Sequence, residues 1–199
     1  MYVRDARKRD EAWLLDHIEE LGLDDATFRS REFVVAVDET TDERAGFGRL
    51  RSHPPADPDA LELTSLGVSP AWQGQGVGAH VVERLVSTAE DNGFDVVYAL
   101  IDEPTYLTQF GFEPVDRSAL PEPIRDRLAT KREGPVPDAI GMRIAVDEFE
   151  MPERLRERFK SARPQEEDPE DVEELASDLA EDFGIDTEQA TYKYDTGRR

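Results

Sequence analysis

Residues 61–92 constrain the fold more than any other stretch of the chain. An apolar strand is predicted over residues 61–68, LELTSLGV, and the glycine-rich segment QGQGVG follows at residues 73–78. A helix begins directly after it, because apolar residues recur there at helical spacing, namely Val77, Val81, Val82, Leu85, Val86 and Ala89. The chain therefore contains a strand, a glycine loop and a helix in immediate succession.

This order of elements predicts an anion site at the loop. Gly74, Gly76 and Gly78 lack Cβ atoms, so successive main-chain amides can turn toward a ligand and approach it closely. The first N–H groups of the following helix have no intrahelical acceptor, and the helix dipole adds positive potential there. Phosphate is the natural ligand for such a site.

A dinucleotide-binding loop is the main alternative, since Gly74, Gly76 and Ala79 also fit the pattern G-x-G-x-x-G/A. In that motif the loop follows its strand directly, and an acidic residue about 20 positions on reads the ribose. Here Pro70 and Trp72 separate strand from loop, and the acid at that distance, Asp95, enters the next predicted strand. We therefore reject the dinucleotide interpretation.

The glycine loop resembles motif A of the GNAT superfamily of acyl-CoA-dependent N-acetyltransferases, whose pattern is Gln/Arg-x-x-Gly-x-Gly/Ala. Gln73, Gly76 and Gly78 occupy its fixed positions. The family's next landmarks, an apolar strand and a short helix ending in Gly-Phe, are matched by residues 96–101 and 106–112. Two motifs in the right order carry the resemblance, which covers residues 1–147.

The resemblance implies an α/β fold: a mixed, mostly antiparallel sheet with splayed central parallel strands, flanked by helices. It also implies acetyl-CoA as co-substrate. In the family the pantetheine arm lies where the central strands part, at positions that match Leu66, Gly67 and Val68. The pyrophosphate lies on the loop, which implies a coenzyme site made of Gln73, Gly74, Gln75, Gly76, Val77 and Gly78.

Two residues are candidates for the chemistry of acetyl transfer. Family members often use a glutamate of the central strand as the base, and Glu62 matches that position. An edge-exposed structural acid is the alternative for Glu62. The family's acid tyrosine matches Leu107 by position, and Tyr106 stands one residue earlier, about 100° away around a helix.

The acceptor site is predicted on the strand before the central one, where Arg49 and Arg51 share a face and either could hold a carboxylate. Solvated arginines on a strand are the alternative. The histidines are interpreted as exposed or structural: His17 in a helix, His53 in a loop and His80 in the helix after the glycine loop.

Three further segments resemble the N-acetylglutamate synthase-like branch of the family: residues 111–115, 120–124 and 136–142. This likeness implies that the acceptor is a primary amine, and it favours the α-amine of an amino acid. The alternatives are a polyamine, antibiotic or protein N-terminal acetyltransferase, or a non-catalytic acyl-CoA-binding regulator.

The charge of the chain is strongly negative, with 46 acidic and 24 basic residues and a net charge of -22 among 199 residues. Such self-repulsion destabilises a compact state unless ions screen it, which predicts a salt-adapted, halophilic protein. It also argues against nucleic acid as a partner. The chain has no cysteine, and no metal site is predicted. Without a long apolar stretch, a cytoplasmic protein with no membrane segment is expected.

Residues 148–199 are predicted to form an acidic C-terminal extension beyond the catalytic domain at residues 1–147. It comprises a linker, a helix at about residues 170–183 with one apolar stripe, and a short arm. The stripe needs a partner surface, so three alternatives stay open: docking on the catalytic domain, pairing in a homodimer, or partial disorder of this segment. Asp10, near the other end of the chain, is predicted to cap a helix that runs to about Leu21.

Overall fold

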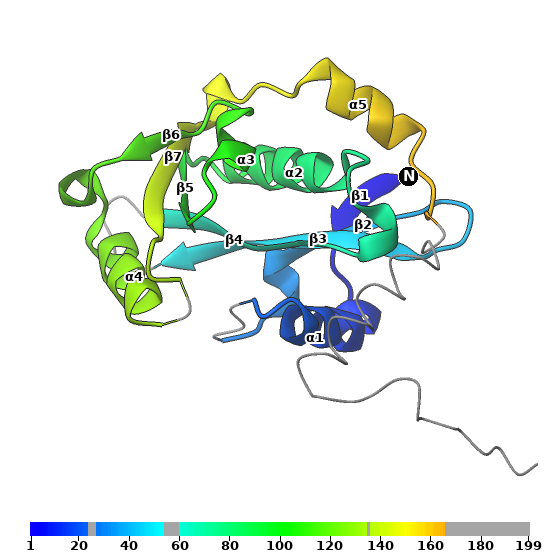
Figure 1. The fold of residues 1–199 in the computed structure, drawn as a ribbon, viewed down its shortest axis with the longest axis horizontal. Coiled ribbons are helices and arrows are strands. Elements are labelled where there is room, and N and C mark those ends of the chain that lie inside the picture. Colours follow the sequence, from blue (N-terminus) through cyan, green and yellow to red (C-terminus); the bar gives the residue numbers. More distant parts are fainter. Residues whose placement is uncertain (24–26, 54–59, 135, 166–199) are drawn as a thin grey trace, which may run out of the picture. The chain divides into compact units, whose positions relative to one another are not determined.

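The computed structural model describes residues 1–23, 27–53, 60–134 and 136–165. The chain divides after Pro164, and the unit Met1–Pro164 is described here. Within the described residues it contains a seven-stranded sheet in the order β1-β2-β3-β4-β5-β7-β6 (Figure 1). The strands are β1 (Tyr2–Asp5), β2 (Phe33–Val37), β3 (Arg44–His53), β4 (Ala60–Val68), β5 (Val96–Ile101), β6 (Glu113–Val115) and β7 (Ile140–Ala145).

The sheet is mixed and mostly antiparallel. β4 and β5 run parallel to each other, and the other neighbouring strands run antiparallel. The parallel pair is short, since it joins only Leu61 to Val97, Glu62 to Tyr98 and Leu63 to Ala99. The predicted fold class, with splayed central parallel strands, is confirmed.

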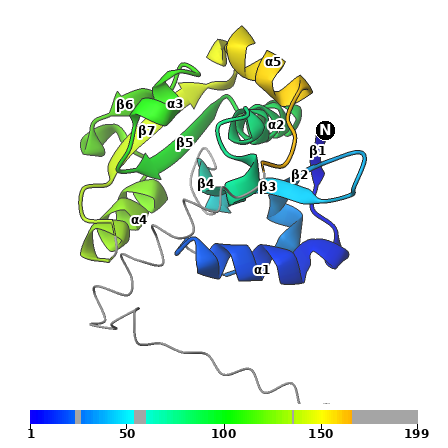
Figure 2. The same ribbon diagram turned by 45° about the vertical axis from the view of Figure 1, so that its right-hand side comes forward.

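Helices cover both faces of the sheet (Figures 1 and 2). α2 (Val77–Asp91), α3 (Thr105–Thr108) and α5 (Glu153–Lys160) lie on one side, and α1 (Glu11–Glu20) lies on the other. α4 (Glu122–Glu133) packs its buried Ile124 and Leu128 near Leu100 of β5. None of the helices in the described part of the chain is both long and apolar enough to cross a membrane.

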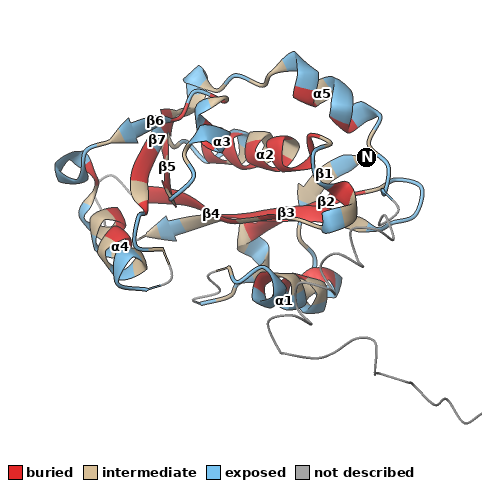
Figure 3. Ribbon diagram, in the orientation of Figure 1, coloured by how far each residue is buried: buried red, intermediate tan, exposed pale blue. Residues whose placement is uncertain are grey.

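The continuous apolar run of β2 is explained by burial on both faces. Val34 and Ala36 belong to the core under α2, whereas Phe33, Val35 and Val37 pack with Leu14 and Ile18 of α1. Figure 3 shows the same pattern, with buried residues along the central strands and on the inner sides of the helices. Two cores on opposite faces thus hold the strands that carry the site.

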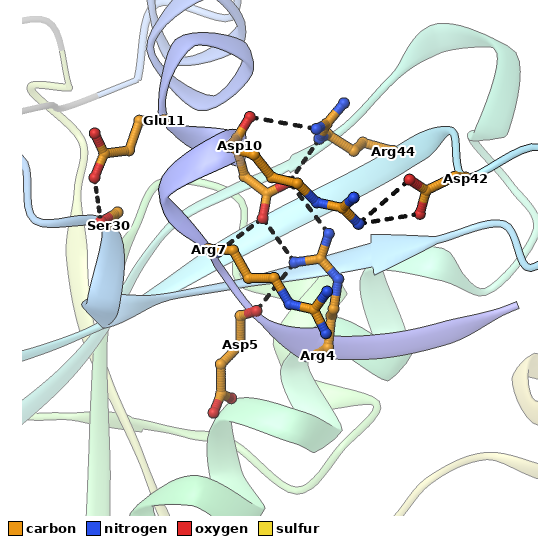
Figure 4. A network of polar contacts seen from close by, with 9 residues as sticks. Arg4, Asp5, Arg7, Asp10, Glu11, Ser30, Asp42 and Arg44 are labelled. Carbon is orange, nitrogen blue, oxygen red and sulfur yellow. Dashed lines mark hydrogen bonds and ion pairs between the residues drawn. The ribbon is translucent and has the colours of Figure 1, made fainter.

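Asp10 precedes α1 as predicted, but its carboxylate does not cap the helix. It accepts hydrogen bonds from Arg4 at 2.6 and 3.1 Å, from Arg44 at 2.7 Å and from the Arg7 amide at 2.7 Å (Figure 4). Burial alone would raise the pKa of Asp10, but these hydrogen bonds outweigh it and the pKa is lowered well below its usual value. The fully buried carboxylate ties the first strand to β3.

The start of the predicted extension belongs to the same unit as the sheet. Residues 148–164 fall within Met1–Pro164, and α5 packs on the main core through Leu155 and Phe159. The predicted helix at about residues 170–183 and the predicted arm lie outside the described residues.

Candidate active site

A bulge in β4 opens the sheet at its centre. Phe47 of β3 pairs with Gly67 and Arg49 pairs with Thr64, so β4 has one residue more than β3 across this interval. Ser65 in the bulge has φ of 49°, which is unusual for a residue other than glycine. Beyond Leu63, β4 no longer pairs with β5. On its β5 side, the main chain of β4 from Thr64 onward therefore faces a gap instead of a neighbouring strand.

Two glycines of the loop have left-handed backbone conformations. Gly74 and Gly76 have φ of 70° and 79°, and Gly76 is the N-cap of α2. Among the described residues, no carbonyl or side chain accepts a hydrogen bond from the amides of residues 74–78. The first turn of α2 contains no acidic residue, although the chain as a whole is acidic. The loop is therefore a set of free donors at a positive helix end.

A cavity of about 590 Å³ joins the gap to the loop. Its walls include all but one of the residues predicted to bind the coenzyme: Leu66, Gly67, Val68, Gln73, Gly74, Gly76, Val77 and Gly78. Gln75 is the exception, because its side chain hydrogen-bonds to the main chain of Ala71 and to that of Arg163, which follows α5. Gln73 donates to the carbonyl of Val68 at 3.2 Å and so fixes the end of β4.

Tyr106 lies in α3 and lines the same cavity. Tyr106 is 37% exposed, but its hydroxyl lies so close to buried Gly78 that a Cβ on Gly78 would stand 2.6 Å from it. Burial raises the pKa of Tyr106 to about 12. The phenol is therefore a protonated hydrogen-bond donor at neutral pH. Leu107, which matches the family's acid position, is buried in the core.

Glu62 is fully buried on the face of the sheet opposite α2. Its Oε2 lies 2.8 Å from Nε2 of His53 and 3.5 Å from Nε of Arg127, and its Oε1 lies 4.0 Å from Nζ of Lys131. Arg51 is its partner across the β3–β4 pair. Because Glu62 has no contact with solvent, neighbouring cations stabilise its carboxylate, and the predicted alternative of exposure at the edge of the sheet is wrong.

His53 was interpreted as an exposed loop residue, and that interpretation is wrong. β3 continues as far as His53, and only 10% of its side chain is exposed. Since strand side chains alternate, His53 shares a face with Arg49 and Arg51. The pairing of His53 with Ala60 brings its imidazole to Glu62.

The two arginines predicted for the acceptor site differ in their surroundings. Arg49 is buried and donates to Glu32 at 2.7 and 2.9 Å and to the Thr27 carbonyl at 2.8 Å. Among the residues that the structure describes, the buried Nη1 of Arg51 has no hydrogen-bond partner. Both arginines and His53 line a cavity of about 250 Å³. Arg51 is therefore the arginine with a donor left for a ligand.

Positive charge collects around Glu62 from two distant parts of the chain. β3 provides Arg51 and His53, and α4 provides Arg127 and Lys131 at positions i and i+4, which share a helix face. Burial lowers the pKa of Arg127, and it lowers that of Lys131 against the opposing effect of Glu62. Within the described ranges, no group of His, Asp and Glu is placed to hold a metal ion.

Four functional candidates were not identified from the sequence: Arg127 and Lys131 beside Glu62, and Arg154 and Arg158 at the larger cavity. The spacing of Arg127 and Lys131 could have indicated a shared face but not the strand that it meets. Arg154 and Arg158 belong to α5 and line the larger cavity. The sequence of α5 is mostly charged, and no local sequence pattern indicates that this helix packs beside the glycine loop.

Comparison with known proteins agrees with this geometry. The model of the family described as Acetyltransferase (GNAT) family matches residues 2–112. That range runs from β1 through the glycine loop to the Gly-Phe pair after α3, and it ends before α4, β7 and α5.

Several solved structures share the fold. N-acetylglutamate synthase from Neisseria gonorrhoeae, complexed with coenzyme A and N-acetyl-glutamate, matches with a TM-score of 0.60 and 20% identity. That match covers 72% of this chain and 34% of the synthase, so the chain spans about a third of that protein. Rv2747 from Mycobacterium tuberculosis, in complex with CoA, matches with a TM-score of 0.61 and 20% identity over 73% of this chain and 99% of its own.

An acetyltransferase of the GNAT family from Staphylococcus aureus matches with a TM-score of 0.56 and 12% identity, over 72% of this chain and 98% of that one.

Proposed function

The chain belongs to the acetyltransferase (GNAT) family, and we propose that it moves an acetyl group from acetyl-CoA to the amine of a small acceptor that also carries a carboxylate. An amino acid is the simplest such acceptor. The observation that carries this proposal is the buried Nη1 of Arg51, which lacks a hydrogen-bond partner among the described residues.

The charge around Arg51 favours an anionic group in the acceptor. Around the carboxylate of Glu62 lie Arg51, Arg127, Lys131 and, when protonated, His53, and the charge of Asp102 also acts on Lys131. An acceptor carboxylate would balance this excess, and a guanidinium can bind it through two parallel hydrogen bonds. A polyamine would add further positive charge, so the same cluster argues against it. N-acetylglutamate synthase, one of the similar structures, was solved with the acetylated amino acid N-acetyl-glutamate.

The coenzyme side of the proposal uses the larger cavity. Acetyl-CoA supplies the acetyl group as a thioester. The free amides of residues 74–78 would bind its diphosphate, and the main chain of Leu66, Gly67 and Val68, which has no partner strand on its β5 side, would align its pantetheine arm.

The acceptor ammonium must lose a proton before its nitrogen can attack the thioester. Glu62 is the proposed base. Because Glu62 has no exposed surface, His53 is the group through which a proton would reach it, at a distance of 2.8 Å. Tyr106 is proposed to donate a hydrogen bond within the coenzyme cavity.

The test is an acceptor screen with detection of the released thiol, in molar KCl. Amino acids should be acetylated, and their decarboxylated analogues, polyamines and aminoglycosides should react far more slowly. Replacing Arg51→Gln should raise KM for the best amino acid roughly 10- to 100-fold, as expected for a hydrogen bond to a charged group. The same substitution should leave KM for the decarboxylated analogue nearly unchanged.

Two results would contradict the proposal. One is a preference for polyamines or other acceptors without a carboxylate. The other is an equal effect of Arg51→Gln on an amino acid and on its decarboxylated analogue, because Arg51 would then not contact the carboxylate. Binding of CoA with no turnover of any amine would instead favour a non-catalytic regulator.

A further inference from the structure

α5 carries positive charge in a strongly acidic chain, and it lies beyond the residues that the family model matches. Between residues 153 and 163 the acidic side chains are Glu153 and Glu157, and the basic ones are Arg154, Arg156, Arg158, Lys160 and Arg163. The chain as a whole has a net charge of -22. This stretch therefore has the opposite sign to most of the protein.

Figure 2 shows α5 beside α2, the helix that follows the glycine loop. α5 also contacts the loop at Gly76, since a Cβ on this residue would lie 2.3 Å from the carbonyl oxygen of Leu155. Phe159 stacks on His80 with ring centroids 3.7 Å apart. Gln75 donates to the Arg163 carbonyl at 2.8 Å and accepts from the Arg163 amide at 2.9 Å. The helix is therefore a fixed wall of the larger cavity.

Two arginines of α5 line this cavity together with Gly74, Gly76 and Gly78. Arg154 donates to the side-chain oxygen of Gln109 at 2.6 Å, and Arg158 donates to the carbonyl of Gly74 at 3.2 Å. Both acceptors are neutral. Within the described part of the chain, neither arginine has a carboxylate within 4.0 Å, whereas Arg156 pairs with Glu83 and Lys160 pairs with Glu157.

We propose that Arg154 and Arg158 bind the phosphate groups of the coenzyme, opposite the amides of the glycine loop. The loop then provides one side of the phosphate site and α5 provides the other. An anion between them would meet main-chain donors and two positive charges that the protein itself does not neutralise. The inference rests on the proposed use of acetyl-CoA, and it assigns α5 to coenzyme recognition.

The experiment measures dissociation constants by calorimetry for CoA, dephospho-CoA and pantetheine. It uses the full chain at the lowest salt concentration that keeps the wild type folded, because salt screens the interaction. Arg154→Gln and Arg158→Gln should each weaken CoA binding roughly tenfold, as expected for a hydrogen bond to a charged group. Pantetheine, which has no phosphate, should bind both variants as it binds the wild type.

Lys160→Gln is the matched control, because it removes the same charge from the same helix at a side chain outside the cavity. It should leave CoA affinity nearly unchanged. Thermal unfolding without ligand, monitored for each variant, shows whether α5 stays packed.

Measurements with dephospho-CoA, which lacks the 3′-phosphate, show which phosphate group the arginines bind. A loss confined to CoA assigns the arginines to the 3′-phosphate, and a loss shared with dephospho-CoA assigns them to the diphosphate. Unchanged CoA affinity in both arginine variants, or an equal loss for pantetheine, would overturn the inference. If the wild type binds no CoA, the proposed acetyl-CoA-dependent function itself is contradicted.

Discussion

The Nε2 atom of His53 lies 2.8 Å from Oε2 of Glu62, and Glu62 has no exposed surface. A buried carboxylate can serve as a base only through a neighbour that reaches the substrate, and His53 lines the smaller cavity. The pair is therefore the proposed proton path from the acceptor.

Substitution of either member of this pair should slow turnover. We expect His53→Gln and Glu62→Gln each to lower kcat about 100-fold, the lower end of the usual effect of general acid–base catalysis. The double variant should be little slower than the single ones, because the two residues act as one unit. Steady-state kinetics test this, with His17→Gln in α1 as a control that should keep wild-type kcat. If the His53→Gln variant keeps the wild-type kcat, His53 does not carry the proton from the acceptor to Glu62.

Tyr106 should contribute as a proton donor over a wide pH range. Because burial raises its pKa to about 12, the phenol keeps its proton throughout an ordinary assay. Tyr106→Phe should therefore lower kcat/KM roughly tenfold or more, by a factor that stays constant between about pH 7 and 10. Parallel measurement of CoA affinity separates loss of binding from loss of chemistry. If the difference in kcat/KM between wild type and Tyr106→Phe disappears by pH 10, the phenol ionises at a lower pH than expected.

Gly76 should tolerate substitution less well than other glycines with positive φ. Gly93 has a similar φ of 80° and open space around it, so Gly93→Ala should cost only the left-handed strain of roughly 1–2 kcal/mol. Gly76→Ala adds a Cβ against the Leu155 carbonyl and should cost more, with weaker CoA binding as well. Urea unfolding of both variants compares the two free energies of unfolding. Equal values would mean that α5 moves away without cost.

Asp10→Asn should destabilise the protein, since it leaves Arg4 and Arg44 without their buried counter-charge. Breaking such a pair typically costs about 3–5 kcal/mol. The lowered pKa of Asp10 means that its contribution is complete above the usual aspartate value of about 3.9 and is lost as pH falls through the lower, folded-state pKa.

The free-energy difference between wild type and Asp10→Asn should thus be constant from about pH 7 to 5 and narrow below about pH 4. Urea unfolding across this range measures it. A difference that does not change with pH would exclude the ionised carboxylate as its cause.

Salt should stabilise the fold. At a net charge of -22 the excess acidic side chains repel one another. The electrostatic screening length falls from about 10 Å at 0.1 M salt to about 3 Å at 1 M, so salt weakens this repulsion. The thermal midpoint should therefore rise markedly between these two KCl concentrations. Sucrose, which favours burial without screening charge, is the control and should raise it much less. An equal midpoint at both salt concentrations would argue against salt adaptation.

The elements that determine the fold could be predicted because their signals are local. The strand predicted at residues 61–68 is observed as Ala60–Val68, and α2 begins at Val77, within the glycine-rich segment of residues 73–78. The loop's conformation follows from glycines at positions where φ is positive. An apolar run, a glycine pattern and helical spacing each occupy a few consecutive residues.

The contacts that complete the site could not be predicted, because they join residues far apart in the sequence. Arg127 and Lys131 reach Glu62 only because α4 packs beside Ala60 of β4 and Leu100 of β5. Arg49 forms an ion pair with Glu32, which precedes β2. Nothing near Arg49 in the sequence indicates that it has this partner and that Arg51 does not. The position of α5 depends on a fit between Gly76 and a helix about eighty residues later.

β1 to β4 form one hydrogen-bonded block of the sheet, and β5, β7 and β6 form another. Their direct link is the short pairing of Leu61, Glu62 and Leu63 with β5. A pantetheine arm that pairs with β4 beyond Leu63 would extend this link across the parted region. The co-substrate would then behave as a temporary strand of the sheet, and amide hydrogen exchange at Leu66 and Val68 would slow whenever it is bound.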